Sequence, residues 1–211
     1  MRTIAIASRK GGSGKTTVAS HLALAAHLRG RQCVIADADP QRSSTTIFKM
    51  RETEGPRCVE TTGRKLFAQQ LAALREGARD LIIDTPAAEE DELAYAIVIA
   101  DLTVLVVRPT FLDFAAIART ADVIRRLGKR AVIVVNQAPF AREGLEAPAV
   151  RQVPAALEFV RLPIAPVVLR QRLAYQNSLA TGQSVEETEP AGAAAGEIAA
   201  LWRYVNEVAA G

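Results

Sequence analysis

The sequence predicts an α/β fold with a mostly parallel, twisted sheet and helices on both faces. Short runs of β-branched residues alternate with segments whose apolar residues recur at steps of three and four, as in successive βαβ units. A glycine-rich segment, residues 10–17, directly follows the first β-branched run, where such folds place a loop before a helix. The chain has 211 residues, which suits one domain, so we expect a single α/β domain over residues 1–211.

The expected strands and helices alternate along the whole chain. The β-branched runs lie at 3–7, 33–36, 81–83, 103–107 and 131–135, with a weaker run at 159–164. The helical segments lie at 16–28, 64–76, 90–100, 112–127 and 147–157. In the segment 112–127 the apolar residues fall on one helical face, and Gly128 supplies a stop signal. Two stretches that contain Gly and Pro, 53–63 and 138–148, are expected to be loops.

Composition argues against several classes of protein. The two cysteines are far apart and only two histidines are present, so a Cys/His metal site is not expected and a reduced, cytoplasmic setting fits best. No apolar run approaches the roughly 18 residues of a membrane span, and the first residues do not form a secretory leader. The net charge of +3 is not by itself a nucleic-acid signature, although a pI near 9.1 permits binding to polyanions.

The segment K-G-G-S-G-K-T-T at residues 10–17 predicts a nucleoside triphosphate site. The loop residues Gly11, Gly12, Ser13 and Gly14 can turn their backbone N–H groups toward phosphates, because glycine has no Cβ to block the approach. Lys15 is then expected to reach the β- and γ-phosphates, and the Thr16 hydroxyl to bind Mg²⁺. Thr17 lies one residue into the helix, close to the α-phosphate position.

The loop departs from the pattern G-x-x-x-x-G-K-[ST], because Arg9 replaces the first glycine and Lys10 follows it. The form K-G-G-x-G-K-T resembles the deviant Walker A motif of the ParA/MinD family of dimerising ATPases. The resemblance implies ATP and Mg²⁺ as cofactors, with Lys15 serving its own nucleotide and Lys10 reaching the nucleotide of the partner subunit. The alternative is a glycine-rich turn with solvated lysines, which the strand before it and the helix after it disfavour.

Polar residues follow most expected strands, at the edge where parallel sheets bind ligands. Asp84 resembles a Walker B aspartate that holds Mg²⁺, and the alternative is a helix cap. The segment D-A-D-P-Q at 37–41 is similar to the family's D-x-D-P-Q signature. By that resemblance, Asp39 is the switch residue near the metal and the attacking water, while Asp37 shapes the loop. An Asx-turn before Pro40 is the alternative, with more weight for Asp37 than for Asp39. Asn136 resembles the residue that recognises adenine, and a simple loop Asn is the alternative.

The resemblance extends into the C-terminal part, which is similar to small, ParF-like plasmid ParA proteins. It implies an ATP-dependent homodimer that binds DNA without sequence preference and is associated with the nucleoid. It also implies release through hydrolysis stimulated by an adaptor or centromere-binding protein of the ParB or ParG type. The expected DNA contacts lie in the stretch 159–185, which lacks Asp and Glu: Arg161, Arg170 and Arg172. A second basic cluster consists of Arg125, Arg126, Lys129 and Arg130, diluted by Asp122. The alternative is that these arginines form a solvated face.

The last segment has an apolar face formed by Ile198, Leu201, Trp202, Val205 and Val208. We expect it to dock on the core and not on a membrane, because acidic residues balance its single arginine. The first hypothesis for function is therefore a partition ATPase for plasmid or chromosomal DNA. The alternatives are a related ATPase that positions a protein cargo such as a chemoreceptor cluster or a carboxysome, a metabolic P-loop enzyme, and a module that holds ATP without turnover.

Overall fold

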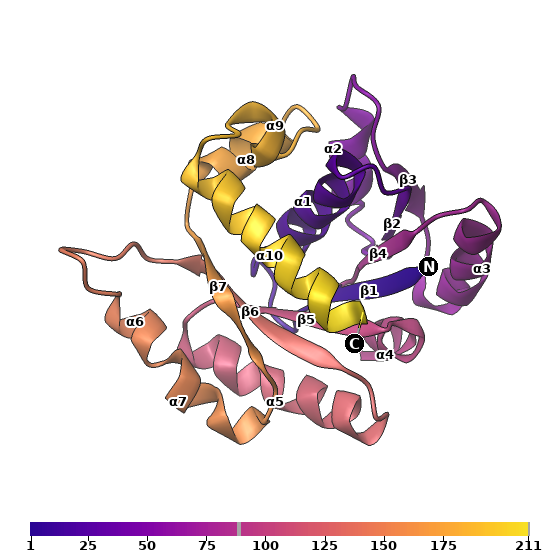
Figure 1. The fold of residues 1–211 in the computed structure, drawn as a ribbon. Helices are drawn as coiled ribbons and strands as arrows, with labels where there is room; N and C mark the ends of the chain where they lie inside the picture. Colours follow the sequence, from indigo (N-terminus) through magenta and orange to yellow (C-terminus); the bar gives the residue numbers. More distant parts are fainter. Residues whose placement is uncertain (88–89, 211) are drawn as a thin grey trace.

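Seven parallel strands form one twisted sheet in the order β3-β2-β4-β1-β5-β6-β7 (Figure 1). This computed structural model describes residues 1–87 and 90–210. The strands are β1 (Arg2–Ala7), β2 (Cys33–Asp37), β3 (Arg57–Glu60), β4 (Asp80–Asp84), β5 (Leu102–Val107), β6 (Ala131–Ala138) and β7 (Ile164–Arg170). The α/β class and the parallel sheet expected from the sequence are confirmed.

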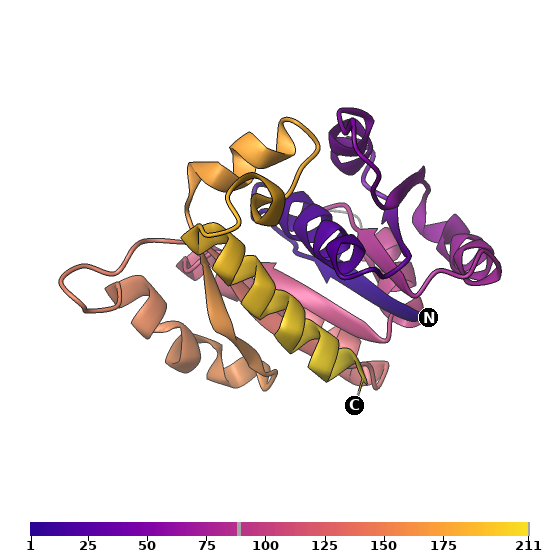
Figure 2. The same ribbon diagram turned by 45° about the horizontal axis from the view of Figure 1, so that its top comes forward.

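Helices cover both faces of this sheet. One layer contains α1 (Lys15–Leu28), α8 (Leu173–Leu179), α9 (Val185–Thr188) and α10 (Ala193–Ala210). The other contains α3 (Leu66–Arg75), α4 (Glu90–Ile99), α5 (Phe111–Arg126), α6 (Pro148–Arg151) and α7 (Val153–Leu157). The short α2 (Ser43–Lys49) and two 3₁₀ turns, η1 (Gly63–Lys65) and η2 (Glu158–Val160), complete the chain. Figure 2 shows α1 and α10 side by side on one face.

The core follows from the alternation of side chains along each strand. In β1, Ile4 and Ile6 pack beneath α1 and α10, whereas Ala5 and Ala7 point to the opposite layer. Both sets are fully buried, because both faces of the sheet carry helices. This is why the strands read as continuous apolar runs in the sequence.

Three expectations about the elements were wrong. The segment 53–63, expected to be a loop, contains the edge strand β3, which pairs only with β2. The strand expected at 159–164 is instead η2 followed by a turn in which Arg161 has a φ of 55°, and β7 begins only at Ile164. The single helix expected at 147–157 is divided into α6 and α7 at Gln152, because Pro154 has no N–H to continue the helical hydrogen bonds.

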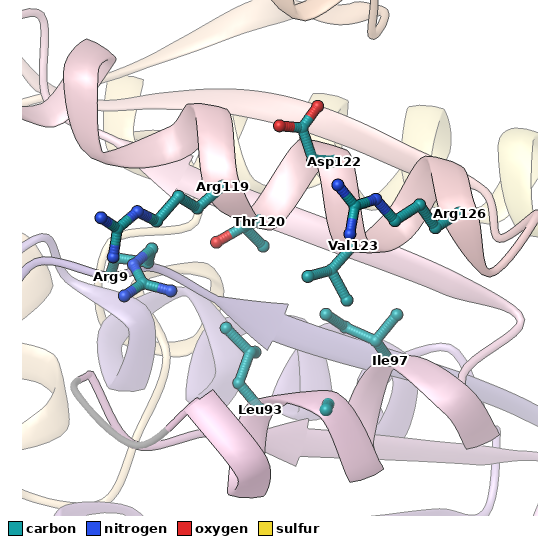
Figure 3. A pocket seen from close by; sticks show the side chains of 9 residues that line it. Arg9, Leu93, Ile97, Arg119, Thr120, Asp122, Val123 and Arg126 are labelled. Carbon is teal, nitrogen blue, oxygen red and sulfur yellow. The ribbon is translucent and has the colours of Figure 1, made fainter.

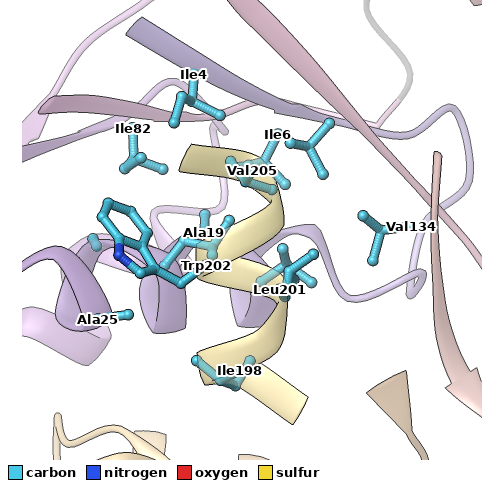
Figure 4. Close-up of a cluster of buried hydrophobic side chains, with 14 of the residues drawn as sticks. Ile4, Ile6, Ala19, Ala25, Ile82, Val134, Ile198, Leu201, Trp202 and Val205 are labelled. Atoms are coloured by element: carbon cyan, nitrogen blue, oxygen red, sulfur yellow. The ribbon is translucent and has the colours of Figure 1, made fainter. Parts of the chain in front are cut away.

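The C-terminal helix α10 docks on the core, as the sequence predicts. Its residues Ile198, Leu201, Trp202 and Val205 are buried against α1 and the strands of the central sheet (Figure 4). Arg2 connects the two ends of the chain, because its guanidinium lies 5.7 Å from the Trp202 ring centroid and donates hydrogen bonds to Asn206. None of the described helices has the length and apolar character needed to cross a membrane.

Replacing Trp202 with alanine will test how much the docking of α10 contributes. Trp202 is 3 % exposed, and removing a buried indole of this kind costs about 3–5 kcal/mol through lost burial and the cavity left behind. We expect the free energy of unfolding, measured by urea denaturation, to fall by that amount. Phe67→Ala is the matched control, because Phe67 is 59 % exposed and its loss should cost less than about 0.5 kcal/mol. Equal losses in both variants would contradict the docked role of α10.

Candidate nucleotide-binding site

A cleft of ≈ 610 Å³ lies at the carboxyl edge of the sheet, where the loops after β1, β2 and β4 meet the end of β6. It brings together most of the residues that the sequence singles out. The lining residues are Gly11, Gly12, Gly14, Lys15, Thr16, Thr17, Asp39, Pro40, Gln41, Ser43, Pro86, Ala87 and Gln137. The structure therefore assembles the glycine-rich loop and Asp39 around one concave space. The roles given to these side chains from the sequence remain predictions.

The start of α1 is built to receive an anion. Gly14 takes a φ of 91° before the helix begins at Lys15, and no side chain caps the first turn. The first turn also contains no acidic residue. Because the first N–H groups of a helix have no partner within the helix, those of α1 face the cleft with their dipoles available. A Cβ placed at Gly11 or Gly12 would meet no atom within 4 Å, so open space lies beside the loop.

The Asn136 side chain holds the glycine-rich loop in this shape. Its Nδ2 donates a 2.8 Å hydrogen bond to the Ser13 carbonyl, and the neighbouring Gln137 Nε2 donates one of 2.8 Å to the Gly12 carbonyl. A Cβ at Gly14 would lie 2.1 Å from Asn136 Nδ2, so only glycine fits there. Asn136 is buried and Gln137 lines the cleft. The structure thus places the Asn136 amide against the loop backbone, and the expected contact with adenine remains a prediction.

Lys15 and Asp84 form the buried charged centre of the site. Burial lowers the pKa of the Lys15 ammonium, and the carboxylates of Asp84 and Asp39 oppose that shift. Burial raises the pKa of Asp84 to about 7, and the hydroxyls of Ser44 and Thr16 oppose it. Ser44 Oγ donates to Asp84 Oδ2 at 2.8 Å. Each group is therefore costly to keep charged while no ligand neutralises the site.

The residues present fit a magnesium ion. Asp84 Oδ1 is buried without a hydrogen-bond partner among the described residues, and the Thr16 hydroxyl acts on the same carboxylate. Across residues 1–87 and 90–210, no group of three or more His, Cys, Asp or Glu side chains could hold a metal alone. Mg²⁺ commonly binds through one or two protein oxygens, with substrate phosphates and water completing the shell. Thr16 and Asp84 supply such a partial set.

The two aspartates after β2 have different environments. Asp37 is fully buried, and its Oδ2 accepts 2.8 Å hydrogen bonds from both the N–H and the hydroxyl of Thr45, at the start of α2. Its Oδ1 accepts from the N–H of Asp39, so Asp37 shapes the loop as expected. Asp39 is half-buried at the cleft, and its Oδ1 accepts the N–H of Gln41 at 2.9 Å. The Asx-turn, which the sequence offers with more weight for Asp37 than for Asp39, therefore forms at both residues.

Lys10 lies outside the cleft that contains Lys15. Its backbone N–H donates to Ser8 Oγ at 3.3 Å, and the residue lines a small cavity of ≈ 10 Å³ between the loop and α5. Lys10 does not appear among the described residues that line the nucleotide cleft. The two lysines of the loop thus face different environments.

The three arginines expected to contact DNA do not form one patch. Arg170 and Arg172 lie at the end of β7, where Glu146 pairs with Arg170 at 2.5 Å and Glu197 with Arg172 at 2.7 Å. These carboxylates come from elements outside the stretch that lacks Asp and Glu, so the fold neutralises charges that the local sequence leaves unbalanced. Arg161 lies before the opposite end of β7, a strand that spans about 20 Å.

Sequence reasoning missed three contributors to this region. Ser44 contacts Asp84, and Gln137 contacts the glycine-rich loop. The run of four hydroxyl residues at 43–46 could have indicated a capped helix start.

The third is a separate pocket of ≈ 230 Å³ between α4 and α5. Figure 3 shows Arg9 of the loop and Arg119 of α5 at one end of this pocket. Leu93 and other apolar side chains form its floor.

Comparison with known proteins agrees with this arrangement. The CobQ/CobB/MinD/ParA nucleotide binding domain family matches residues 4–185. The maintenance of carboxysome distribution protein A of Halothiobacillus neapolitanus is 25 % identical over 98 % of this chain and 95 % of its own. A Cyanothece McdA variant in complex with ATP superposes with a TM-score of 0.78, at 18 % identity over 99 % of this chain and 96 % of that one. The septum site-determining protein MinD of Pyrococcus horikoshii, complexed with Mg-ADP, superposes with a TM-score of 0.76, at 19 % identity over 99 % and 97 %.

His21 anchors the first helix of the site and gives it a measurable pH dependence. Its Nδ1 is 2.9 Å from the Thr17 carbonyl and its Nε2 is 3.3 Å from Ser178 Oγ, while its ring meets Tyr175 edge-on. Burial lowers the pKa of His21 from 6.5 to about 4, and the Thr17 carbonyl opposes this only in part. Between these values the unfolded chain binds the proton and the folded chain does not, so the free energy of unfolding falls as the pH falls.

We therefore expect the wild-type protein to lose about 3 kcal/mol more than His21→Gln between pH 7 and pH 4. Urea denaturation at a series of pH values gives this difference, because all other titrating groups are common to both proteins. A His21→Gln curve parallel to the wild type would show that His21 does not stay neutral in the folded protein.

Proposed function

The chain belongs to the CobQ/CobB/MinD/ParA nucleotide-binding domain family, and from that premise we propose that it is a switch ATPase that dimerises around ATP. The observation that carries the proposal is the separation of the two lysines of the loop. Lys15 is buried in the cleft of its own subunit, whereas Lys10 is not among the described residues that line that cleft and lines the small cavity beside α5. A cation in this position serves a nucleotide only when a second subunit presents one.

Within one subunit, the loop and α1 would bind the triphosphate. The glycine backbone and the N–H groups at the start of α1 would cradle the phosphates, and Lys15 would neutralise charge on the β- and γ-phosphates. Thr16 and Asp84 would hold Mg²⁺, which supplies charge neutralisation on the phosphate oxygens when it is bound. Gln137 and the backbone held by Asn136 would complete the wall of the cleft.

Hydrolysis would depend on positioning more than on covalent chemistry. Asp39 is half-buried at the cleft, and its own Asx-turn holds one carboxylate oxygen in place. We assign it the role of orienting the attacking water. Lys10 of the second subunit would stabilise the charge of the transition state, as an arginine finger does. Such a site has a low intrinsic rate until a partner protein completes it.

For the cellular role, we propose movement of a cargo over the nucleoid by an ATP-bound dimer that binds DNA without sequence preference. An adaptor of the ParB or ParG type would stimulate hydrolysis and release the dimer. Plasmid or chromosomal DNA is the first candidate for the cargo, and the sequence itself does not separate it from a protein cargo, because the adaptor selects the cargo. The similarity to a carboxysome distribution protein over nearly the whole chain favours a protein complex as the second candidate. A metabolic enzyme of the same family is less well supported, because the segment D-A-D-P-Q at 37–41 is similar to the switch signature of ParA-type proteins.

Size exclusion coupled to light scattering tests the dimer directly. With Mg²⁺ and a slowly hydrolysed ATP analogue, the mass of the wild type should double from 22.6 kDa, whereas ADP should leave a monomer. Lys10→Ala should remain a monomer that still binds the nucleotide, and Lys15→Ala should lose the nucleotide. Lys65→Ala, which removes an exposed lysine, should dimerise normally. A mass that does not respond to nucleotide would remove the switch mechanism.

Asp39→Ala will separate binding from hydrolysis. Losing a group that orients and activates the attacking water should reduce ATP turnover by roughly 10²–10⁴-fold. The dimer formed with ATP should persist, because the phosphate contacts remain. Phosphate release and light scattering measure the two properties on the same sample, and Glu52→Ala is the control for loss of an exposed carboxylate. Normal turnover in Asp39→Ala would assign the switch to another residue.

A further inference from the structure

Two basic segments that are remote in the sequence meet at the amino edge of the sheet, opposite the nucleotide cleft. Helix α5 begins after the carboxyl end of β5 and returns to the amino edge, where β6 and β7 start. The end of α5 and the turn before β7 enclose a groove of ≈ 580 Å³. Its lining residues are Ile124, Arg125, Gly128, Lys129, Phe159, Arg161 and Leu162. We call it the amino-edge groove.

Cations dominate this groove. Arg125, Lys129 and Arg161 line it, and no carboxylate occurs among its described lining residues. Lys129 Nζ donates to the Ala100 carbonyl at 3.2 Å, and a neutral carbonyl leaves the ammonium charge in place. Within the described residues Arg161 forms no ion pair. Arg125 Nη1 lies 2.8 Å from Asp122 Oδ1, but both side chains are more than half exposed, so solvent screens this pair.

A hydrogen bond from a side chain to the backbone joins the two walls of the groove. Arg125 Nη2 donates to the Val160 carbonyl at 3.3 Å, which connects α5 to the turn before β7. Arg161 has a φ of 55°, a left-handed conformation that costs a side chain other than glycine about 1–2 kcal/mol. Such strain is kept where the surrounding structure uses the resulting direction of the chain. The turn places Arg161 in the lining of the groove together with Arg125 and the half-exposed ring of Phe159.

We propose that the amino-edge groove binds the phosphate backbone of duplex DNA through Arg125, Lys129 and Arg161. The proposal rests on the proposed function, which supplies DNA as the partner, and it assigns the surface. It replaces Arg170 and Arg172 as the main contacts, because Glu146 and Glu197 already pair with those two arginines. A polyanion fits better than a lipid surface, since Phe159 is the one large exposed apolar side chain among the lining residues described.

Phosphate contacts of this kind are independent of base sequence and release counterions. The decisive measurement is therefore the salt dependence of binding to a labelled duplex of random sequence, followed by fluorescence anisotropy with ATP and Mg²⁺ between ~50 and ~200 mM salt. The test variant is Arg125→Gln/Lys129→Gln/Arg161→Gln, which removes three charges and keeps side-chain size. The matched control is Arg64→Gln/Lys65→Gln/Arg75→Gln, three exposed cations around α3. Thermal unfolding shows that each variant is folded.

In the groove variant, the slope of log K against log salt should become shallower by about 3 for each subunit whose groove contacts the duplex, since each phosphate contact contributes roughly 0.9. The control variant should keep the wild-type slope. The assignment would be overturned if the groove variant kept the wild-type slope, or if only Arg170→Gln/Arg172→Gln weakened binding to the duplex. Either result would leave DNA binding by the protein intact. A wild type that binds no DNA would remove the DNA partner from the proposed function as well. Groove-dependent binding to phosphatidylserine vesicles without DNA binding would make the groove a membrane surface and overturn the proposal.

Discussion

The close approach between Gly14 and Asn136 is the constraint on which the site depends. The loop leaves a fully buried strand and must turn into α1 within a few residues, so it uses positive φ angles at Gly12 and Gly14. The amides of Asn136 and Gln137 then hold two loop carbonyls, and the space left at Gly14 is too small for any side chain. The backbone N–H groups and side chains at the start of α1 that face the cleft take their direction from the backbone conformation at Gly14.

The same arrangement leaves the cleft electrostatically incomplete. Lys15 and Asp84 are both buried, and burial disfavours the charged form of each. Phosphate oxygens would compensate the ammonium, and a divalent cation would compensate the carboxylate. The fold therefore carries a local electrostatic cost that a ligand relieves, as is common where a protein is built for binding and not for maximal stability.

The sequence was informative wherever the determining contacts are local. Buried parallel strands read as continuous apolar runs, and the loop from Lys10 to Thr17 contains most of the residues expected to bind phosphate and Mg²⁺. Both features could therefore be predicted. The edge strand β3 is short, half-exposed and pairs with one neighbour, so its sequence carried no comparable signal. The pairing of Arg170 with Glu146 joins residues 24 positions apart, which counting charges along one segment does not detect. The position of Lys10 outside the cleft likewise depends on how α5 packs.

The contact between β1 and α10 ties the nucleotide loop to a distant part of the sequence. Strand β1 leads directly into that loop, and α10 packs against it together with α1. Arg2 binds Asn206, 204 positions away, and lies against Trp202, so β1 and α10 stabilise each other. A change that loosens α10 is therefore expected to reach the P-loop through the strand that carries it, although none of the α10 residues lines the cleft described at the carboxyl edge.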